Sequence, residues 1–287
     1  MISEIRHLPN NPELRGQAEL VGPLTYSENG QTLTLILPWA PHDDRTVHAC
    51  PVILFVQGSA WHYPNINYEI PMLSHFAEEG IAVATVHHRS TGDGHPFPAF
   101  LQDVKCAIRF LRTNAEHYGL DPARIAAFGT SSGGNTVCLL GVTGDDPAYR
   151  TEEYPDVSDS VCAVVSCFAP TDLNALFAGY QKVPESRPFM AAAFGEDDST
   201  WDEQMRRYSP VALVRDGQSY PPYLLVHGTA DPVVPVDQMD KMYVRLKEAG
   251  AEVSAFYVDG AEHEGNFWSP EVRSVIHDEL IRMLMPS

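Results

Sequence analysis

The chain has 287 residues and a formal net charge of −19, from 19 basic and 38 acidic side chains. This charge argues against nucleic acid and anionic membrane surfaces as partners, because both repel a strongly acidic protein. Hydrophobic residues make up 44% of the chain, which is enough for a core, and no apolar run reaches the ~20 residues that a membrane span needs. The segment from Met1 to Arg6 lacks the basic and apolar pattern of a signal peptide, so we expect a cytoplasmic protein.

The apolar residues follow a pattern that predicts strands alternating with helices. Such alternation implies a mostly parallel eight-stranded sheet with helices on both faces. No linker-like tract or internal repeat divides the chain, so we expect one α/β domain spanning residues 1–287. In chain order, the expected strands are 19–26, 31–37, 52–56, 81–87, 125–128, 161–168, 224–226 and 253–258, and the expected helices are 68–79, 102–117, 135–142, 236–248 and 270–283.

The stretch between the sixth and seventh expected strands, at about residues 171–218, is too long for a simple crossover. Insertions at this position commonly cover an active site, so we expect a small cap here. Its aromatic and methionine side chains are candidates for the substrate pocket, although each can instead pack the insertion onto the domain. The candidates are Phe189, Met190, Phe194 and Trp201, together with Trp61 from an earlier loop.

A Gly-x-Ser-x-Gly sequence, Gly129 to Gly133, follows the fifth expected strand and precedes a predicted helix. Glycine at both ends leaves room for the sharp bend that exposes the central serine hydroxyl. Matches of this length also arise by chance in glycine-rich turns, but the flanking strand and helix are those that a nucleophile requires. Ser131 is therefore our candidate nucleophile, and it needs a histidine base, an acid and donors for an oxyanion.

Two later strand ends supply the acid and the base. Asp231 follows the seventh expected strand and His263 follows the eighth, both at the sheet edge where catalytic groups of open α/β sheets gather. A helix cap is the simpler role for Asp231. Glu262 and Glu264 are weaker candidates for the acid, because sequence neighbours of a histidine seldom reach its ring nitrogens. The expected catalytic set is therefore Ser131, Asp231 and His263.

The loop from Gln57 to Trp61 follows the continuous apolar run of the third expected strand. Its small residues allow the backbone to approach a ligand closely. We expect the amides of Ser59 or Ala60, together with the amide of Ser132, to form an oxyanion hole, in which each donor is worth about 3 kcal/mol. An ordinary strand-to-helix loop is the alternative.

Nothing in the histidines or cysteines indicates a metal site. The adjacent pair His87 and His88 would lie on opposite faces of a strand and cannot chelate one ion there. The cysteines are odd in number and form no Cys-x-x-Cys pair, so we expect reduced thiols. They are Cys50, Cys106, Cys138, Cys162 and Cys167. We therefore expect neither a metal nor a cofactor.

With these motifs in place, the chain resembles α/β-hydrolase esterases of the hormone-sensitive-lipase-like and feruloyl/acetyl-esterase type over most of its length. The order Ser, Asp, His along the chain is that of the α/β-hydrolases. Gln57 stands where this family usually has histidine, and Ser59 and Ala60 replace two glycines. The shared landmarks are Gln57-Gly58-Ser59-Ala60-Trp61, Asp103 to Leu111, Tyr118 to Ile125, His227-Gly228-Thr229-Ala230-Asp231 and Gly260-Ala261-Glu262-His263.

The resemblance implies the α/β-hydrolase fold and a serine carboxylic-ester hydrolase that forms an acyl-enzyme on Ser131. It also favours short-chain acyl, acetylated-sugar or hydroxycinnamate esters, including those derived from plant carbohydrates, as small-molecule substrates. An amidase, a formamidase or an exopeptidase would use the same residues, and a non-catalytic hydrolase-like binding protein is a less favoured alternative. The natural substrate is left open, and a homodimer is compatible with the sequence.

Overall fold

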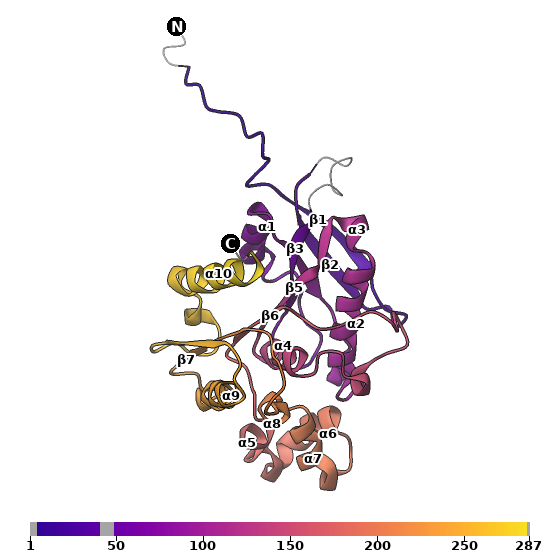
Figure 1. Cartoon of the computed structure of the whole chain (residues 1–287). Helices are drawn as coiled ribbons and strands as arrows, with labels where there is room; N and C mark the ends of the chain where they lie inside the picture. Colours follow the sequence, from indigo (N-terminus) through magenta and orange to yellow (C-terminus); the bar gives the residue numbers. More distant parts are fainter. Residues whose placement is uncertain (1–4, 41–48, 286–287) are drawn as a thin grey trace.

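The computed structural model describes residues 5–40 and 49–285, and a sheet of eight strands runs through it (Figure 1). The strands are β1 (Ala18–Thr25), β2 (Thr32–Pro38), β3 (Cys50–Val56), β4 (Ala82–Val86), β5 (Leu120–Thr130), β6 (Ala163–Cys167), β7 (Tyr223–Gly228) and β8 (Val253–Val258). Their order across the sheet is β1-β2-β4-β3-β5-β6-β7-β8. β2 is antiparallel to both its neighbours, and all other neighbouring strands are parallel. The predicted mostly parallel eight-stranded α/β sheet is thereby confirmed.

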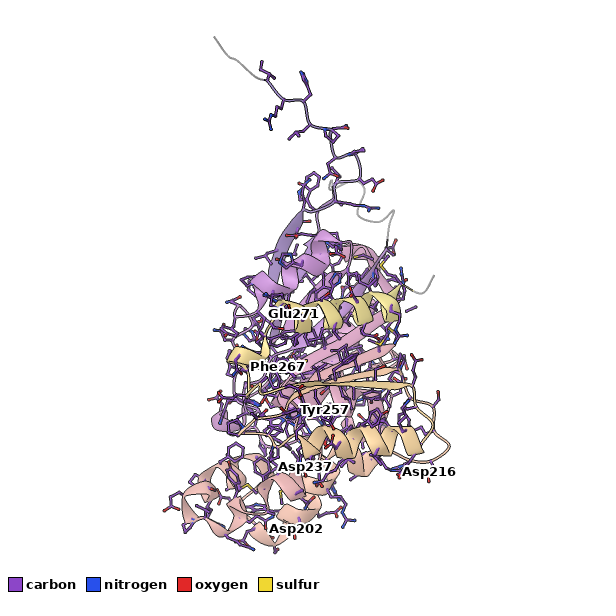
Figure 2. The ribbon with its side chains drawn as sticks, turned by 90° about the vertical axis from the view of Figure 1, so that its left-hand side faces the viewer. Asp202, Asp216, Asp237, Tyr257, Phe267 and Glu271 are labelled. Carbon is purple, nitrogen blue, oxygen red and sulfur yellow. The ribbon has the colours of Figure 1, made fainter. Side chains whose placement is uncertain are left out.

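The position of each strand in the sheet explains its residue pattern. Every residue of β4 and of β6 is buried, because helices cover both faces of these central strands. β8 forms one edge of the sheet and exposes Phe256 and Tyr257. Figure 2 shows Tyr257 on this edge, above α9 (Asp237–Glu248). The continuous apolar runs of the sequence therefore mark the centre of the sheet.

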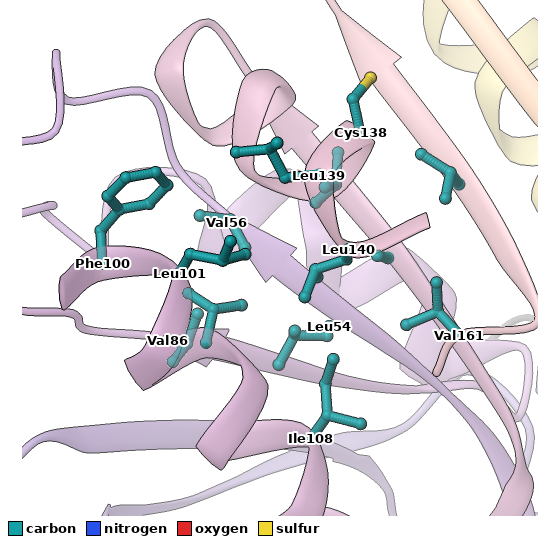
Figure 3. Close-up of a cluster of buried hydrophobic side chains, with 14 of the residues drawn as sticks. Leu54, Val56, Val86, Phe100, Leu101, Ile108, Cys138, Leu139, Leu140 and Val161 are labelled. Carbon is teal, nitrogen blue, oxygen red and sulfur yellow. The ribbon is translucent and has the colours of Figure 1, made fainter. Parts of the chain in front are cut away.

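Helices cover both faces of the sheet. The longer ones are α1 (Ile70–Glu78), α2 (Ala99–Thr113), α4 (Ser132–Val142), α9 and α10 (Pro270–Leu284). α2, α4 and α9 share one buried apolar cluster with the sheet, in which Leu54 of β3 lies near Ile108 of α2 and Leu140 of α4 (Figure 3). α1 and α10 cover the opposite face through residues such as Phe76 and Ile276. This two-sided burial holds the carboxyl ends of the parallel strands together at one edge.

The helix predicted at 102–117 differs from the observed helices at both ends. α2 begins three residues earlier, at Ala99, and it ends at Thr113. The next residue, Asn114, turns its side-chain amide back onto the carbonyl of Phe110 at 2.8 Å and competes with the helical hydrogen bonds. A short helix, α3 (Ala115–Tyr118), follows.

The segment between β6 and β7 folds into short helices at one end of the molecule (Figure 1). Their aromatic rings pack together and onto Phe97, which contacts Phe194 at a centroid distance of 5.0 Å. The helices are α5 (Leu173–Phe177), α6 (Arg187–Phe194), α7 (Trp201–Arg207) and α8 (Pro210–Leu213). Short 3₁₀ turns complete the structure, at η1 (Thr91–Asp93), η2 (Pro147–Tyr149), η3 (Tyr180–Lys182), η4 (Pro184–Ser186), η5 (Asp198–Thr200) and η6 (Gly265–Phe267).

Most of the acidic charge lies on the surface, as Figure 2 shows for Asp202 and Asp216. One buried exception is Asp159, which binds Nζ of Lys105 at 2.6 Å and Nη1 of Arg109 at 2.8 Å. All three side chains are fully buried, so the cost of burying each charge is offset by its pairing with the opposite charge. No helix in the part of the chain that the structure describes has both the length and the apolar character needed to cross a membrane.

Candidate active site

Ser131 lies in the sharp turn between β5 and α4, with a backbone φ of 51° and ψ of −122°. This conformation is rare for a residue with a side chain, and close packing maintains it. A Cβ on Gly129 would overlap the carbonyl of Gly133, and a Cβ on Gly133 would overlap the carbonyl of Val56, so both positions require glycine. The Ser131 amide donates to the Cys167 carbonyl at 2.9 Å, which ties the turn to the end of β6.

His263 lies in the loop after β8, and its ring connects the two other predicted residues. Nε2 is 2.9 Å from Oγ of Ser131, and Nδ1 is 2.7 Å from Oδ2 of Asp231. The ring packs edge-on against Phe168 at a centroid distance of 4.8 Å. An ionised carboxylate only accepts hydrogen bonds, so the proton belongs on Nδ1 and Nε2 faces the serine hydroxyl as an acceptor. The structure thus brings together the three side chains that the sequence singled out.

The side chain of Asp231 is fully buried and is surrounded by hydrogen-bond donors. The amides of Val233 and Val234 donate to Oδ1 at 2.8 and 2.9 Å. Nε2 of His227 is 3.4 Å from Oδ2, and it also lies 2.8 Å from the carbonyl of Val234. Burial by itself raises the pKa of Asp231, but the hydrogen bonds from His227, His263 and the two amides outweigh it and hold this pKa well below its usual range. The carboxylate is therefore charged and fixed.

The loop after β3 approaches Ser131 with an unusual backbone. Ala60 and Trp61 have φ values of 50° and 58°, although neither is glycine. The amide of Ser59 donates to Oγ of Ser132 at 2.9 Å, so it is not free to bind an oxyanion, and our expectation for Ser59 does not fit this geometry. The amide of Ala60 has no acceptor among the described residues, and the amide of Ser132 is at the first position of α4, where no helical acceptor exists.

Glu69 supports this loop, and no pattern in the sequence pointed to this role. Nε2 of Gln57 donates to Oε1 of Glu69 at 3.3 Å, and both side chains are buried. Burial is the largest cause that raises the pKa of Glu69 to about 7; the hydrogen bond from Gln57 opposes this rise, and the nearby charge of Glu264 adds to it. Glu69 falls within the helix expected at 68–79, but α1 begins after it, at Ile70.

A pocket of about 240 Å³ opens beside Ser131 and has mostly apolar walls. The walls come from the loop after β3, from the loop after β7 and from the segment between β6 and β7. Trp61 and Phe189 line this pocket, as expected. The complete lining is Ala60, Trp61, Ser131, Ser132, Pro170, Leu176, Phe177, Tyr180, Phe189, Val233 and Val234.

Met190, Phe194 and Trp201 do not line the pocket, contrary to our expectation. All three are buried in the apolar cluster that joins the segment to the rest of the molecule. Met190 and Phe194 are four residues apart and share the inner face of α6, whereas Phe189 points in another direction. The indole nitrogen of Trp201 donates to the carbonyl of Gly195 at 2.7 Å and holds the ring inside the segment.

The described residues also form a cavity away from the predicted catalytic residues. A separate cavity of about 370 Å³ lies between α1 and α10 and includes none of the predicted catalytic residues. Within residues 5–40 and 49–285, no group of three or more His, Cys, Asp or Glu side chains is arranged to hold a metal ion.

Known sequences match a large part of the chain. The sequence model of the BD-FAE family matches residues 40–246. Esterase LipC of Mycobacterium tuberculosis is 31% identical over 227 residues, which cover 77% of this chain and 54% of LipC. Esterase LipQ of the same bacterium is 26% identical over 257 residues, which cover 88% of this chain and 59% of LipQ. The chain therefore spans about half the length of the curated relatives it matches.

Solved structures share the fold. A truncated form of a carbohydrate esterase from gut microbiota is 27% identical, with a TM-score of 0.77 over 93% of this chain and 97% of that chain. The thermophilic esterase Est2 of Thermogutta terrifontis is 24% identical, with a TM-score of 0.73 over 96% of each chain, and this likeness shows the fold alone. Together with the match over residues 40–246, these similarities show that the chain belongs to the BD-FAE family of α/β-hydrolase esterases.

Proposed function

We propose that this protein is a serine carboxylic-ester hydrolase, and the hydrogen-bonded series from Asp231 through His263 to Ser131 carries the proposal. Oγ of Ser131 attacks the acyl carbonyl carbon while Nε2 of His263 takes the hydroxyl proton. Nε2 then gives this proton to the oxygen of the leaving alcohol as the C–O bond breaks, and an acyl-enzyme remains. Water, deprotonated by His263 in the same way, releases the carboxylic acid and restores Ser131.

The amides of Ala60 and Ser132 serve as the oxyanion donors in this proposal. Neither amide has a partner in the described chain, and both belong to residues that line the pocket beside Ser131. Donors held in place before reaction stabilise the tetrahedral intermediate without reorganisation. Asp231 stays ionised, fixes the orientation of His263 and stabilises the imidazolium that forms.

The pocket supports a preference for compact acyl groups. Its volume of about 240 Å³ and its apolar walls suit acetyl to butyryl chains or one aromatic ring, and they leave no room for a long lipid chain. Acetylated sugars and hydroxycinnamate esters, including those from plant carbohydrates, are the substrate class we propose. One solved relative, 27% identical, is itself described as a carbohydrate esterase.

The segment at about 171–218 acts in this proposal as a small cap on a single α/β-hydrolase domain. Leu176, Phe177, Tyr180 and Phe189 of this segment line the pocket. Met190, Phe194 and Trp201 of the segment are buried in the same cluster as the helices on that face of the sheet. A cap built this way limits the length of the acyl group while staying packed on the domain.

The test is covalent labelling of Ser131 by a fluorophosphonate probe, located by mass spectrometry, combined with turnover of para-nitrophenyl acetate. Replacing the nucleophile, Ser131→Ala, should abolish labelling and lower kcat by about 10⁴-fold or more. Ser219→Ala, in an exposed loop, is the matched control and should behave like the wild type. Undiminished turnover by Ser131→Ala would refute the proposal, and faster cleavage of amide or formamide substrates than of any ester would favour an amidase.

A further inference from the structure

Glu69 is a buried carboxyl group in surroundings that suit its neutral form. Its side chain is 7% exposed, and Oε1 accepts one hydrogen bond from Gln57. Oε2 is buried and has no hydrogen-bond partner among the described residues. Although Glu69 directly precedes α1, its side chain does not cap that helix. A buried oxygen without a donor is costly for a neutral carboxyl group and much more so for a charged one.

Glu69 contacts one of the loops on which the proposed reaction depends and lies near the other. Gln57 directly follows β3 and begins the loop that presents the amide of Ala60. Glu264 directly follows His263 and lies close enough to Glu69 for their charges to repel each other. The backbone φ of 63° at Glu264 shows that this part of the loop is held in a restricted conformation.

We propose that Glu69 is a positioning residue of the active site, and that it acts in its neutral form by holding Gln57 while tolerating Glu264 beside His263. This inference rests on the proposed function. The groups that face Glu69 are Gln57 from the end of β3 and Glu264 from the loop after β8, and His263 in turn faces Glu264.

Ionisation of Glu69 would place a second negative charge opposite Glu264 in a buried space. The two carboxylates can separate if Glu69 swings away from Gln57. The start of the loop that carries the amide of Ala60 then loses its support. They can also separate if Glu264 moves outward and takes His263 with it. Either movement displaces the amide of Ala60 or the ring of His263 by up to about 1 Å, which is enough to slow the chemical step. The pKa of Glu69, raised by burial to about 7, places this change in the neutral to alkaline range.

The test compares the pH profiles of the wild type and of Glu69→Gln. Glutamine has the shape of the neutral carboxyl group, accepts from Gln57 and carries no charge. We expect wild-type kcat on para-nitrophenyl acetate to fall by about fivefold between pH ~6.5 and pH ~9 with little change in KM, whereas Glu69→Gln stays within about twofold of its maximum. Glu262→Gln removes an exposed charge on the other side of His263 and should keep the wild-type profile.

A second variant makes the test independent of how well Glu69→Gln folds. Glu264→Gln removes the repulsion and leaves Glu69 in place, so it should also reduce the loss of kcat above pH ~7. The proposal is wrong if both variants keep the wild-type alkaline decline, or if Glu262→Gln abolishes that decline. Fluorophosphonate labelling of Ser131, run in parallel at pH ~6.5, separates this failure from failure of the proposed function, because Glu69 is mostly neutral at that pH.

Discussion

Asp231 and Glu69 are two buried carboxyl groups beside the same site, and they differ in the number of donors around them. Asp231 receives hydrogen bonds from His263 and from the amides of Val233 and Val234, and it lies 3.4 Å from His227. Glu69 receives one hydrogen bond, from Gln57, and leaves one oxygen unpaired. Burial raises the pKa of both groups, yet the net pKa of Asp231 is lowered and that of Glu69 is raised to about 7.

This difference shows that donors, and not burial, decide which acid is charged. The charge of Asp231 is held against Nδ1 of His263. Another buried carboxyl group, Asp159, has a different set of partners, since it is paired with the two cations Lys105 and Arg109.

Removing the charge of Asp231 should have the largest effect. In Asp231→Asn the amide group can donate toward Nδ1, which reverses the tautomer of His263 and leaves a proton on the nitrogen that must accept one from Ser131. We expect kcat to fall by about 10³- to 10⁴-fold with a small change in KM. Steady-state kinetics checks this, and Asp259→Asn in the exposed turn after β8 is the matched control. A loss below tenfold would mean that another carboxylate orients the histidine.

The two carboxyl groups should contribute to stability with opposite pH dependence. The folded-state pKa of Glu69 lies above its ordinary value of 4.5, so its contribution is complete below pH 4.5 and is lost as the pH rises through about 7. The folded-state pKa of Asp231 lies below its ordinary value of 3.8, so its contribution is present above that pH and is lost as the pH falls further.

Urea unfolding at a series of pH values measures this difference. From pH ~4.5 to pH ~8, the free energy of unfolding of the wild type should fall relative to that of Glu69→Gln by up to about 3 kcal/mol. If the free energy of unfolding depended on pH in the same way for the two proteins, Glu69 would have an ordinary pKa. The contrast between Glu69 and Asp231 would then be wrong.

Removing one donor from Asp231 should have the smallest effect. His227→Phe keeps the volume of a buried ring and removes the nitrogen that lies 3.4 Å from Oδ2. The other donors remain, so we expect kcat to fall about fivefold, equivalent to about 1 kcal/mol. His227→Gln retains a donor and should lose less. If His227→Phe were as inactive as Asp231→Asn, His227 would be an essential partner of the acid.

The positions of Ser131, Asp231 and His263 could be predicted because parallel strands fix them. Each follows a strand that the apolar pattern identifies, and the carboxyl ends of neighbouring parallel strands meet at one edge of the sheet. The convergence of these side chains could therefore be predicted without knowledge of the loop conformations. The sheet itself was predictable for the same reason, since its central strands are continuous apolar runs.

Contacts that depend on the path of a loop could not be predicted. The engagement of the Ser59 amide by Ser132 and the pairing of Gln57 with Glu69 arise from loop conformations that leave no periodic signal. Composition also could not separate Phe189 from Met190, because adjacent residues of one helix face the pocket and the interior respectively. Only the packing direction of α6 distinguishes them.

The backbone at Ala60 and Trp61 has a consequence for the durability of the site. Each residue occupies a left-handed conformation that costs about 1 kcal/mol or more without glycine. The carbonyl of Trp61 is anchored by the amide of Thr91 at 3.0 Å, and the amide of Ser59 is anchored by Ser132. Relaxation of this loop requires these hydrogen bonds to open together with the packing of the buried Trp61 ring against Phe97, whereas the sheet opens in a larger cooperative unit. Heat resistance of the fold and heat resistance of the active site are therefore two separate properties of this protein.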